Sequence, residues 1–392
     1  MKIKIASCYF MSNYGSILQA YALQKYLENQ GFDVENICID GIKKELDAAK
    51  IKYYIREAKD FSVILNKFGR VKKTIRKKMN KSYRKSLELR AMEVNRFRGE
   101  HLKVSPPLES IDAMGEYVKD SDAVIVGSDQ LWLPSNIVAN YYTLNFVPEQ
   151  IKKISYATSF GISSLPNNFK ERTKNFLSSF SAISVREDTG ERIIEDLGLK
   201  CKLVCDPTML LTKEDWDSVI PIRDRIGEPY IFCYFLGKIP EHRELAKKIK
   251  KETGYKIVAL LHCEQYSKCD YGYADITPYD VGPDGFINLI RNASVVLTDS
   301  FHGSCFSIIN QRNFFSLPRH RDDEKLSTNS RIYSLAHVLD FKDRVFSIKD
   351  LDRIHASDKI NYSQINKNLS SLRSDSRGFI LNALMQNAND HK

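Results

Sequence analysis

Short apolar segments that alternate with helical segments restrict the fold of this 392-residue chain more than any other feature. The helical segments carry good helix formers and end at turn residues, as at Gly31. Apolar runs joined by helices form parallel sheets with crossover connections, so this order predicts an α/β protein. The strand-like runs lie at 2–9, 33–39, 123–132, 153–161, 182–188, 202–208, 230–237, 256–262, 294–300 and 313–317.

A polar stretch at 212–228 separates two such series of strands and helices. The length of 392 residues also favours two cores over one. We therefore predict two doubly wound Rossmann-like domains that face each other across a cleft, with the site where the carboxyl ends of the strands meet. The predicted units are an N-terminal domain at 1–212, a C-terminal domain at 228–362, and a helix with a disordered tail at 363–392.

Positive charge is concentrated in one segment. The net charge is +10, and residues 50–100 contain 17 Lys and Arg against 5 Asp and Glu. Helical composition and few breakers predict a basic helical insertion in the N-terminal domain, at about 45–100. The insertion either contacts an anionic membrane surface or is a solvated arm without a partner. The apolar side chains that favour the membrane are Tyr53, Tyr54, Ile55, Phe61, Val63, Ile64, Leu65 and Phe68.

Several classes of protein are disfavoured. No apolar run approaches the roughly 18 residues of a membrane-spanning helix, and the N-terminus resembles a strand rather than a signal peptide. We therefore expect a cytoplasmic protein, peripheral at the inner face of the membrane if the insertion binds lipid. The eight cysteines include no CxxC pair, so no metal site is predicted. Neither a dinucleotide fingerprint nor a Walker A loop is present, and no nucleic-acid recognition motif accompanies the charge.

Polar clusters follow five of the predicted strands, and a parallel sheet brings such loops together at one edge. Asp129 and Asp206, in two of these clusters, orient sugar hydroxyls, act as bases, or simply cap the next segment. Trp132 either stacks on a ligand or packs in the core. The five clusters lie at 13–15, 127–130, 184–188, 206–208 and 300–303.

His302 and Arg186 are the side chains most suited to chemistry. His302 precedes a predicted helix, whose N-terminal amides favour an anion, and imidazole exchanges protons near neutral pH. The alternative is a capping or packed histidine. Arg186 either binds a carboxylate or phosphate through bidentate hydrogen bonds or forms an ordinary surface ion pair. Arg319 and Arg331 add a second cationic group after the last strand.

Six motifs occur in one order along the chain, which they cover from about Lys2 to Leu339. They are NYGSILQAYALQ (13–24), IVGSDQLW (125–132), ISVREDTG (183–190), DPTMLL (206–211), VGPDGFINLIRNASVVLTDSFHGSCFSI (281–308) and NSRIYSLAHVL (329–339). Together they resemble the polysaccharide pyruvyl transferase family. A single short motif such as NYG or DPT is weak, but six in order are specific.

The resemblance implies a fold like that of the two-domain GT-B glycosyltransferases. It implies transfer of pyruvate from phosphoenolpyruvate to two hydroxyls of a sugar, with no bound organic cofactor, in bacterial exopolysaccharide or capsule synthesis. The family's histidine and arginine map onto His302 and Arg186. Some members carry Arg-Leu where this chain has Ser300-Phe301, so Arg319 or Arg331 is expected to supply the missing charge.

Phosphoenolpyruvate carries a carboxylate and a phosphate, and its methylene carbon must be protonated, which requires cationic clamps and an acid. We therefore predict that His302 is the acid/base. The predicted acceptor is a sugar, carried on a lipid. The predicted phosphoenolpyruvate ligands are Arg186, Ser300, Gly303, Ser304, Arg319 and Arg331. The predicted acceptor ligands are Asn13, Tyr14, Gly15, Ser16, Ser128, Asp129 and Gln130.

Two other functions fit the same fold. One is a glycosyltransferase that uses a nucleotide sugar, with the helix led by His302 taking the diphosphate. The other is a sugar-binding or assembly protein without catalysis. An assay of the products distinguishes the three functions. Phosphate release with a gain of pyruvyl mass indicates the pyruvyl transferase, nucleotide release indicates the glycosyltransferase, and neither product indicates the protein without catalysis.

Overall fold

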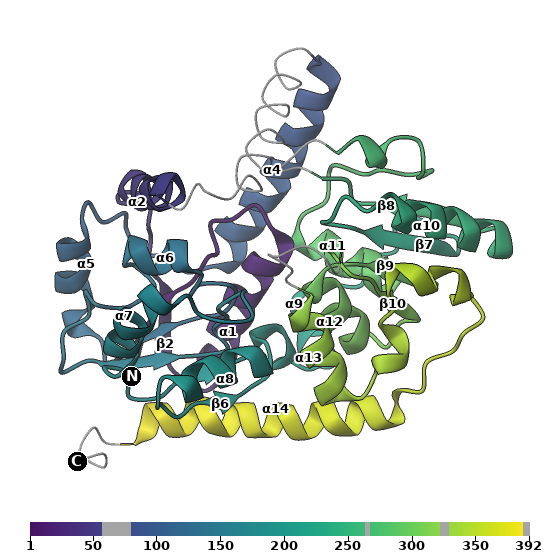
Figure 1. Cartoon of the computed structure of the whole chain (residues 1–392). Coiled ribbons are helices and arrows are strands. Elements are labelled where there is room, and N and C mark those ends of the chain that lie inside the picture. The colour runs from purple at the N-terminus through teal and green to yellow at the C-terminus, as the bar shows by residue number, and fades with distance from the viewer. Residues whose placement is uncertain (57–79, 263–266, 322–328, 387–392) are drawn as a thin grey trace.

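A computed structural model of the chain describes residues 1–56, 80–262, 267–321 and 329–386. Two four-stranded parallel sheets form its two halves, with strand orders β2-β1-β3-β4 and β10-β9-β7-β8 (Figure 1). A short parallel pair, β5 and β6, continues the first sheet through isolated bridges to β4. The prediction of an α/β fold with parallel sheets is confirmed. The strands are β1 (Lys2–Ala6), β2 (Asp33–Asn36), β3 (Ala123–Val126), β4 (Lys152–Ser155), β5 (Ser184–Val185), β6 (Lys202–Leu203), β7 (Tyr230–Tyr234), β8 (Lys256–Ala259), β9 (Val295–Thr298) and β10 (Phe314–Ser316).

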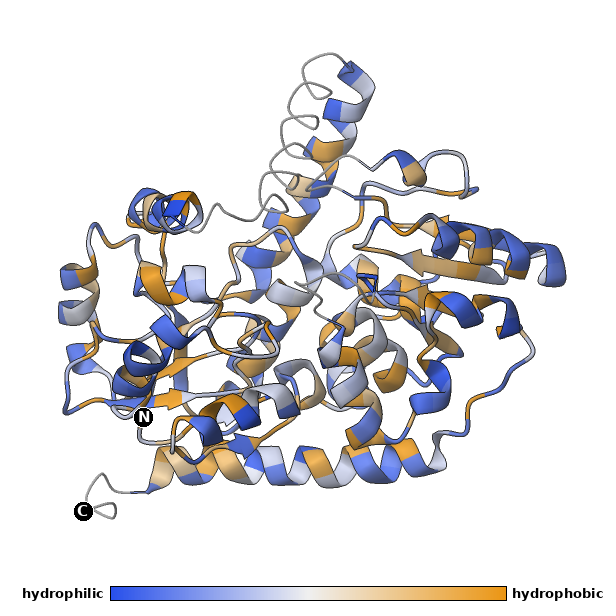
Figure 2. Ribbon diagram, viewed as in Figure 1, coloured by the Kyte–Doolittle hydropathy of each residue, from blue (hydrophilic) through white to orange (hydrophobic). Residues whose placement is uncertain are grey.

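Helices connect the strands and cover the sheets, with hydrophilic residues on outer helices such as α10 and hydrophobic residues gathered in the strands (Figure 2). The helices are α1 (Tyr14–Asn29), α2 (Lys43–Arg56), α4 (Lys81–His101), α5 (Ile111–Tyr117), α6 (Pro134–Ala139), α7 (Asn167–Leu177), α8 (Asp188–Asp196), α9 (Lys213–Val219), α10 (Pro240–Thr253), α11 (Pro283–Arg291), α12 (Phe301–Ile309), α13 (Ser330–Leu339) and α14 (Tyr362–Met385). Short 3-10 helices lie at Val118–Asp120, Pro207–Met209, Lys268–Asp270, Lys342–Arg344 and Ile348–Arg353. In the described part of the chain, no helix has both the length and the apolar character needed to cross a bilayer.

Two helices begin earlier than their sequence suggests. Asn13 caps α1 by accepting a hydrogen bond from the Gly15 amide at 2.9 Å, and Ser300 caps α12 by accepting one from the Gly303 amide at 3.3 Å. The predictions that residues 13–15 form a loop and that His302 lies just before a helix were therefore wrong. His302 lies inside the first turn of α12, where its ring is fixed by the helix rather than by a loop.

The basic insertion is described at α2 and α4, and its central part, 57–79, lies outside the described residues. Helix α4 joins the two halves. Its buried Arg90 donates hydrogen bonds to the backbone carbonyls of Pro278 at 2.8 Å and Tyr279 at 3.0 Å, and Arg96 pairs with Asp284 at 2.7 Å. The inner side of α4 is therefore part of the framework, while its outer side carries the exposed charge.

One continuous core extends from the first sheet to the second. The ring of Tyr14 stacks on Phe286 at 5.0 Å, and its hydroxyl donates to the Val281 carbonyl at 2.8 Å. Trp216 packs edge-on against Phe306 at 5.1 Å. These contacts join α1 to α11 and α9 to α12, and the first of them brings two of the sequence motifs into one place.

Helix α14 runs along one side of both halves (Figure 1, yellow). Near its start, the Tyr362 hydroxyl donates to the Arg312 carbonyl at 2.6 Å. Further along, Ser376 accepts a hydrogen bond from the Cys205 amide at 2.8 Å, and Lys152 donates to the Leu384 carbonyl at 2.5 Å. The predicted tail helix is thus a strap across the molecule, and the predicted disorder at 387–392 lies outside the described residues.

Candidate active site

His302 is held against a buried carboxylate. Its Nε2 lies 3.4 Å from Oδ2 of Asp206, and only 8% of its side chain is exposed. Asp206 also accepts hydrogen bonds from the Thr208 amide and hydroxyl, at 3.0 and 2.8 Å. Burial opposes ionisation, but the charges of His302 and Arg186 hold the pKa of Asp206 well below its usual range. Asp206 is thus a permanent anion that orients the imidazole and stabilises its protonated form.

Gly15 makes room for the His302 ring. A Cβ atom at Gly15 would lie 2.0 Å from His302 Nδ1, far inside van der Waals contact. The first turn of α1 and the first turn of α12 therefore touch through a glycine backbone and an imidazole. Since Nε2 faces Asp206, Nδ1 beside Gly15 is the nitrogen left to meet a ligand.

Arg186 is the centre of a buried ion-pair network. Its Nη1 lies 2.9 Å from Asp206 Oδ2, its Nη2 lies 3.0 Å from Asp129 Oδ1, and its Nε lies 3.4 Å from Glu187 Oε2. The guanidinium also lies over the Phe301 ring, 4.6 Å from its centroid. No part of the side chain is exposed, so the alternative of an ordinary surface ion pair is wrong. As an anion ligand Arg186 stays a prediction, because three carboxylates already surround it.

The predicted acceptor ligands of the first half are mostly buried. Asp129 accepts a hydrogen bond from the Ser16 hydroxyl at 2.8 Å, and the nearby charges of Arg186, His302 and Arg331 hold its pKa low against the effect of burial. Ser128 is inaccessible and donates to the Ala157 carbonyl at 2.6 Å. These side chains fix the site's framework, and their contact with a sugar stays a prediction.

The remaining acceptor candidates divide between caps and packing. Asn13 caps α1, and Tyr14 is buried between the halves, where a sugar reaches it only if they separate. The amide nitrogen of the Gln130 side chain packs beside Gly161. Trp132 is fully buried and donates to the Tyr142 carbonyl at 3.1 Å, so of its two predicted roles core packing is the correct one.

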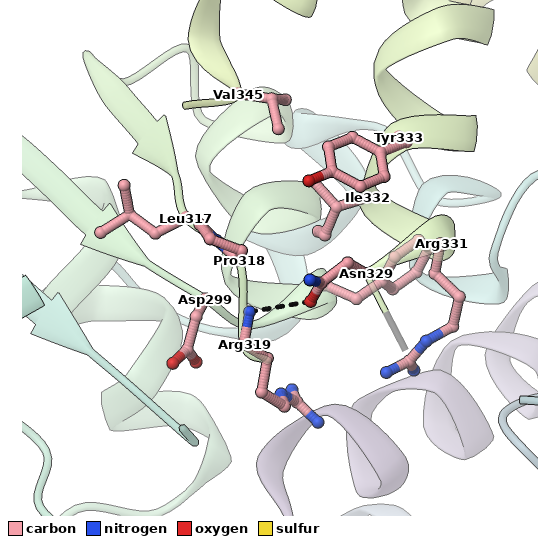
Figure 3. Close-up of a pocket in the computed structure, with 10 residues that line it drawn as sticks. Asp299, Leu317, Pro318, Arg319, Asn329, Arg331, Ile332, Tyr333 and Val345 are labelled. Carbon is pink, nitrogen blue, oxygen red and sulfur yellow. Dashed lines mark hydrogen bonds between the residues drawn. The ribbon is translucent and has the colours of Figure 1, made fainter. Parts of the chain in front are cut away.

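Arginines line a small pocket beside this network (Figure 3). The side chains of Arg319 and Arg331 point to the same side of it. Burial and the neighbouring Arg186 and Arg319 guanidiniums lower the pKa of Arg331 to about 9. An anion in the pocket would relieve this repulsion. The lining residues are Asp299, Phe301, Leu317, Pro318, Arg319, Asn329, Arg331, Ile332, Tyr333 and Val345; hereafter this is the arginine pocket.

Neutral and acidic side chains shape the arginine pocket, and sequence reasoning did not select them. Asn329 accepts hydrogen bonds from the amides of Arg319 and His320, at 2.9 and 3.2 Å, which fixes the loop before α13. Asp299 accepts from the amides of Leu236 and Gly237, at 2.6 and 2.8 Å. Asp299 lies in the motif at 281–308 and Asn329 in the motif at 329–339, close in sequence to the predicted ligands Ser300 and Arg331. Their position in these motifs is the sequence signal that could have identified them.

The other predicted ligands on α12 have structural partners. Ser304 is buried and lies 2.7 Å from the Ser316 hydroxyl of β10. A Cβ atom at Gly303 would lie 2.4 Å from the Thr298 hydroxyl, so this position requires glycine. Together with the Ser300 cap they set the direction in which α12 leaves β9 and thereby place His302.

Comparison with known proteins decides the family. The family model for polysaccharide pyruvyl transferases matches residues 13–321, which include both the Gly15 and the His302 turns. The chain belongs to this family. The sequence resemblance is thus confirmed, and the family's place in polysaccharide biosynthesis and its transferase class apply to this member. A search of curated proteins finds no match to the sequence.

Solved structures show the fold. UDP-GlcNAc 2-epimerase from Methanocaldococcus jannaschii is 12% identical, with a TM-score of 0.51, and the match covers 97% of this chain and all of that one. SsfS6, a glycosyltransferase from Streptomyces sp. SF2575, is 11% identical over 98% of this chain and all of that one, with a TM-score of 0.42. The predicted GT-B fold is confirmed, and at these identities the likeness extends to the fold alone.

Proposed function

We propose that this family member transfers pyruvate from phosphoenolpyruvate to two hydroxyls of one sugar, forming a cyclic ketal. The observation that supports this most directly is His302, backed by the buried Asp206 and next to the arginine pocket. An acid/base group thus lies near two guanidiniums, those of Arg319 and Arg331, that can pair with a dianion or trianion.

The arginine pocket suits the charge of phosphoenolpyruvate. Arg319 and Arg331 present two guanidiniums, and each binds a carboxylate or a phosphate through paired N–H groups. The lowered pKa of Arg331 indicates that its cationic form is destabilised without an anion. Arg186, compensated by its carboxylates, would act by fixing Asp129 and Asp206 rather than by direct contact with the donor.

The reaction moves two protons. One sugar hydroxyl gives its proton up as its oxygen bonds to C2 of phosphoenolpyruvate, and the methylene carbon gains a proton to become a methyl group. The second hydroxyl then attacks C2, the C2–O bond to phosphate breaks, and phosphate leaves with the second proton. His302 would carry protons through Nδ1, while Asp206 stabilises the imidazolium.

The acceptor is proposed to be a sugar of a bacterial surface polysaccharide, carried on a lipid. The test offers the purified protein phosphoenolpyruvate or nucleotide sugars, with candidate acceptors. Phosphate release with a pyruvyl mass gain on the acceptor supports the proposal. Release of nucleotide from a nucleotide sugar supports a glycosyltransferase instead, and absence of both supports a binding protein.

Replacing Arg331 with alanine is expected to raise the KM for phosphoenolpyruvate about 10- to 100-fold, the loss expected for charged hydrogen bonds. Arg331→Lys should lose less, since it keeps the charge but not the paired N–H groups. Phosphate release at varied donor concentration measures both. The control is Arg321→Ala, an exposed arginine paired with Glu241, which should leave KM unchanged. An unchanged KM in Arg331→Ala would place the donor elsewhere.

The insertion is proposed to contact an anionic membrane surface. On α2, Ile51 and Ile55 are exposed by 50% and 66%, lie one turn apart, and have Lys52 and Arg56 beside them. Co-sedimentation with vesicles should require an anionic lipid and weaken with salt, and it should fall when both isoleucines are changed to serine. The exposed Ile222, changed to serine, is the control. Binding that ignores lipid charge and salt would reject the idea.

A further inference from the structure

A second pocket lies between α4 and the loops that follow β8. Its volume is about 280 Å³, near the lower end of small-molecule sites. Aromatic and hydroxyl-bearing side chains are frequent among the residues that line it, and these residues come from the insertion and from the C-terminal half. They are Tyr83, Leu261, His262, Ser267, Asp270, Tyr271, Gly272, Ala274, Thr277 and Tyr279; we name this set the tyrosine groove.

The charge of the tyrosine groove is internally balanced. Asp270 accepts a hydrogen bond from Arg243 at 2.8 Å and lies 2.6 Å from His262 Nδ1. Among the described lining residues, Asp270 and His262 are the ones able to carry charge, and they pair with each other. The groove therefore lacks the excess of cations that a phosphate or carboxylate requires, in contrast to the arginine pocket.

Its surface is suited to a neutral sugar. Tyrosine rings offer flat apolar faces against which the C–H face of a sugar ring packs, and their hydroxyls bond to the sugar's hydroxyls. Three tyrosines line the groove, and Ser267 and Thr277 add further hydroxyl groups. Tyr271 is 53% exposed at its edge, so one ring is presented to a ligand that arrives from solvent.

Hydrogen bonds connect the groove to the catalytic motif. His262 Nε2 lies 3.0 Å from the Leu236 carbonyl, and the Leu236 amide donates to Asp299, three residues before His302. The sheet order places β8 two strands from β9, a lateral distance of about 10 Å. These hydrogen bonds fix the groove relative to the segment that carries His302, on the side of the second sheet where the carboxyl ends of its strands lie.

We infer that the tyrosine groove binds the sugar adjoining the one that receives pyruvate, so the acceptor is an oligosaccharide rather than a single sugar. The inference rests on the proposed function. It assigns part of the acceptor to α4 and the C-terminal half, whereas the sequence favoured the N-terminal half. It also gives the insertion a role in specificity, because Tyr83 of α4 forms one wall.

The test uses matched p-nitrophenyl glycosides with the same terminal sugar, galactoside with lactoside and glucoside with cellobioside. Tyr271→Ala removes the exposed ring, and Thr277→Trp fills the groove. For a disaccharide that serves as acceptor, each variant should lower kcat/KM about tenfold, as expected for a lost aromatic contact, and leave the monosaccharide unchanged. Tyr255→Ala, at the opposite end of β8, is the control and should change neither.

Binding is measured separately, by saturation-transfer NMR of the same glycosides without phosphoenolpyruvate. If no glycoside is pyruvylated but the disaccharides bind the natural protein and lose binding in both variants, the groove stands and the proposed reaction fails. The inference is overturned if disaccharides bind the natural protein no better than monosaccharides. It is equally overturned if the variants affect both lengths alike or neither.

Discussion

Replacing His302 with glutamine is expected to lower kcat for pyruvyl transfer about a thousandfold and to leave the protein folded, because general acid–base catalysis contributes about 10²- to 10⁴-fold. Glutamine keeps similar bulk and a hydrogen-bond donor toward Asp206, which lies 3.4 Å from the histidine Nε2. It cannot carry a proton at neutral pH. Phosphate release and the mass of the acceptor measure the loss.

The control for this variant is His355→Gln. His355 is exposed, with 54% of its side chain accessible, and it lies near Glu252 rather than near the site. We expect it to retain full activity. If His302→Gln released phosphate at the natural rate with acceptor present, the acid/base role would belong to another group. A large rise in KM at unchanged kcat would instead make His302 a binding residue.

Gly15→Ala is expected to lower kcat about a hundredfold, although the change adds one methyl group outside the chemistry. The new Cβ would lie 2.0 Å from His302 Nδ1, so the ring must leave its place beside Asp206. A displacement of about 1 Å in a catalytic group costs roughly this factor. The crowded contact should also destabilise the protein by about 1–3 kcal/mol, measurable by urea unfolding.

Gly99 supplies the matched control. It also lies in a helix, α4, but nothing lies within 4 Å of the position its Cβ would take. Gly99→Ala should therefore keep full activity and stabilise the protein slightly, by about 0.5–1 kcal/mol from helix propensity. Full activity in Gly15→Ala would show that the observed position of His302 is not the one used in the reaction.

The α/β architecture could be predicted from the sequence because each strand and each helix has its own local signal, an apolar run or a helical segment. Each strand of the two sheets coincides with a predicted apolar run to within one residue, since β4 begins at Lys152 and its run at 153, and every residue of β9 is buried. The contact of His302 with Asp206 was not predicted as a pair, but it agrees with the prediction that the carboxyl ends of the strands of two domains face each other. The first residues of α1 and α12 could not be predicted from the sequence. They depend on whether Asn13 and Ser300 act as N-caps, which the local sequence permits but does not require.

The contacts that Arg186, Tyr14 and Arg90 make with distant residues could not be predicted from the sequence. That Arg186 meets three carboxylates from separate segments depends on the register of β5 beside β4 and β6. Tyr14 was chosen as an acceptor ligand for its motif, and only the packing of α1 on α11 shows its ring against Phe286. Helix α4 gave no sign in its composition that the buried Arg90 docks on the second half.

Helix α14 bears on how ligands enter. Two-domain enzymes of this shape commonly open by hinge rotation, with a few loop residues absorbing the movement. Here a helix of 24 residues, about 36 Å long, is anchored at one end near Arg312 and at the other near Lys152. Because α14 is attached to both halves, a wide rotation of one half against the other requires that α14 bend or that one of its ends detach. Entry and exit would then depend on small local motions, and turnover would not require a swing of whole domains.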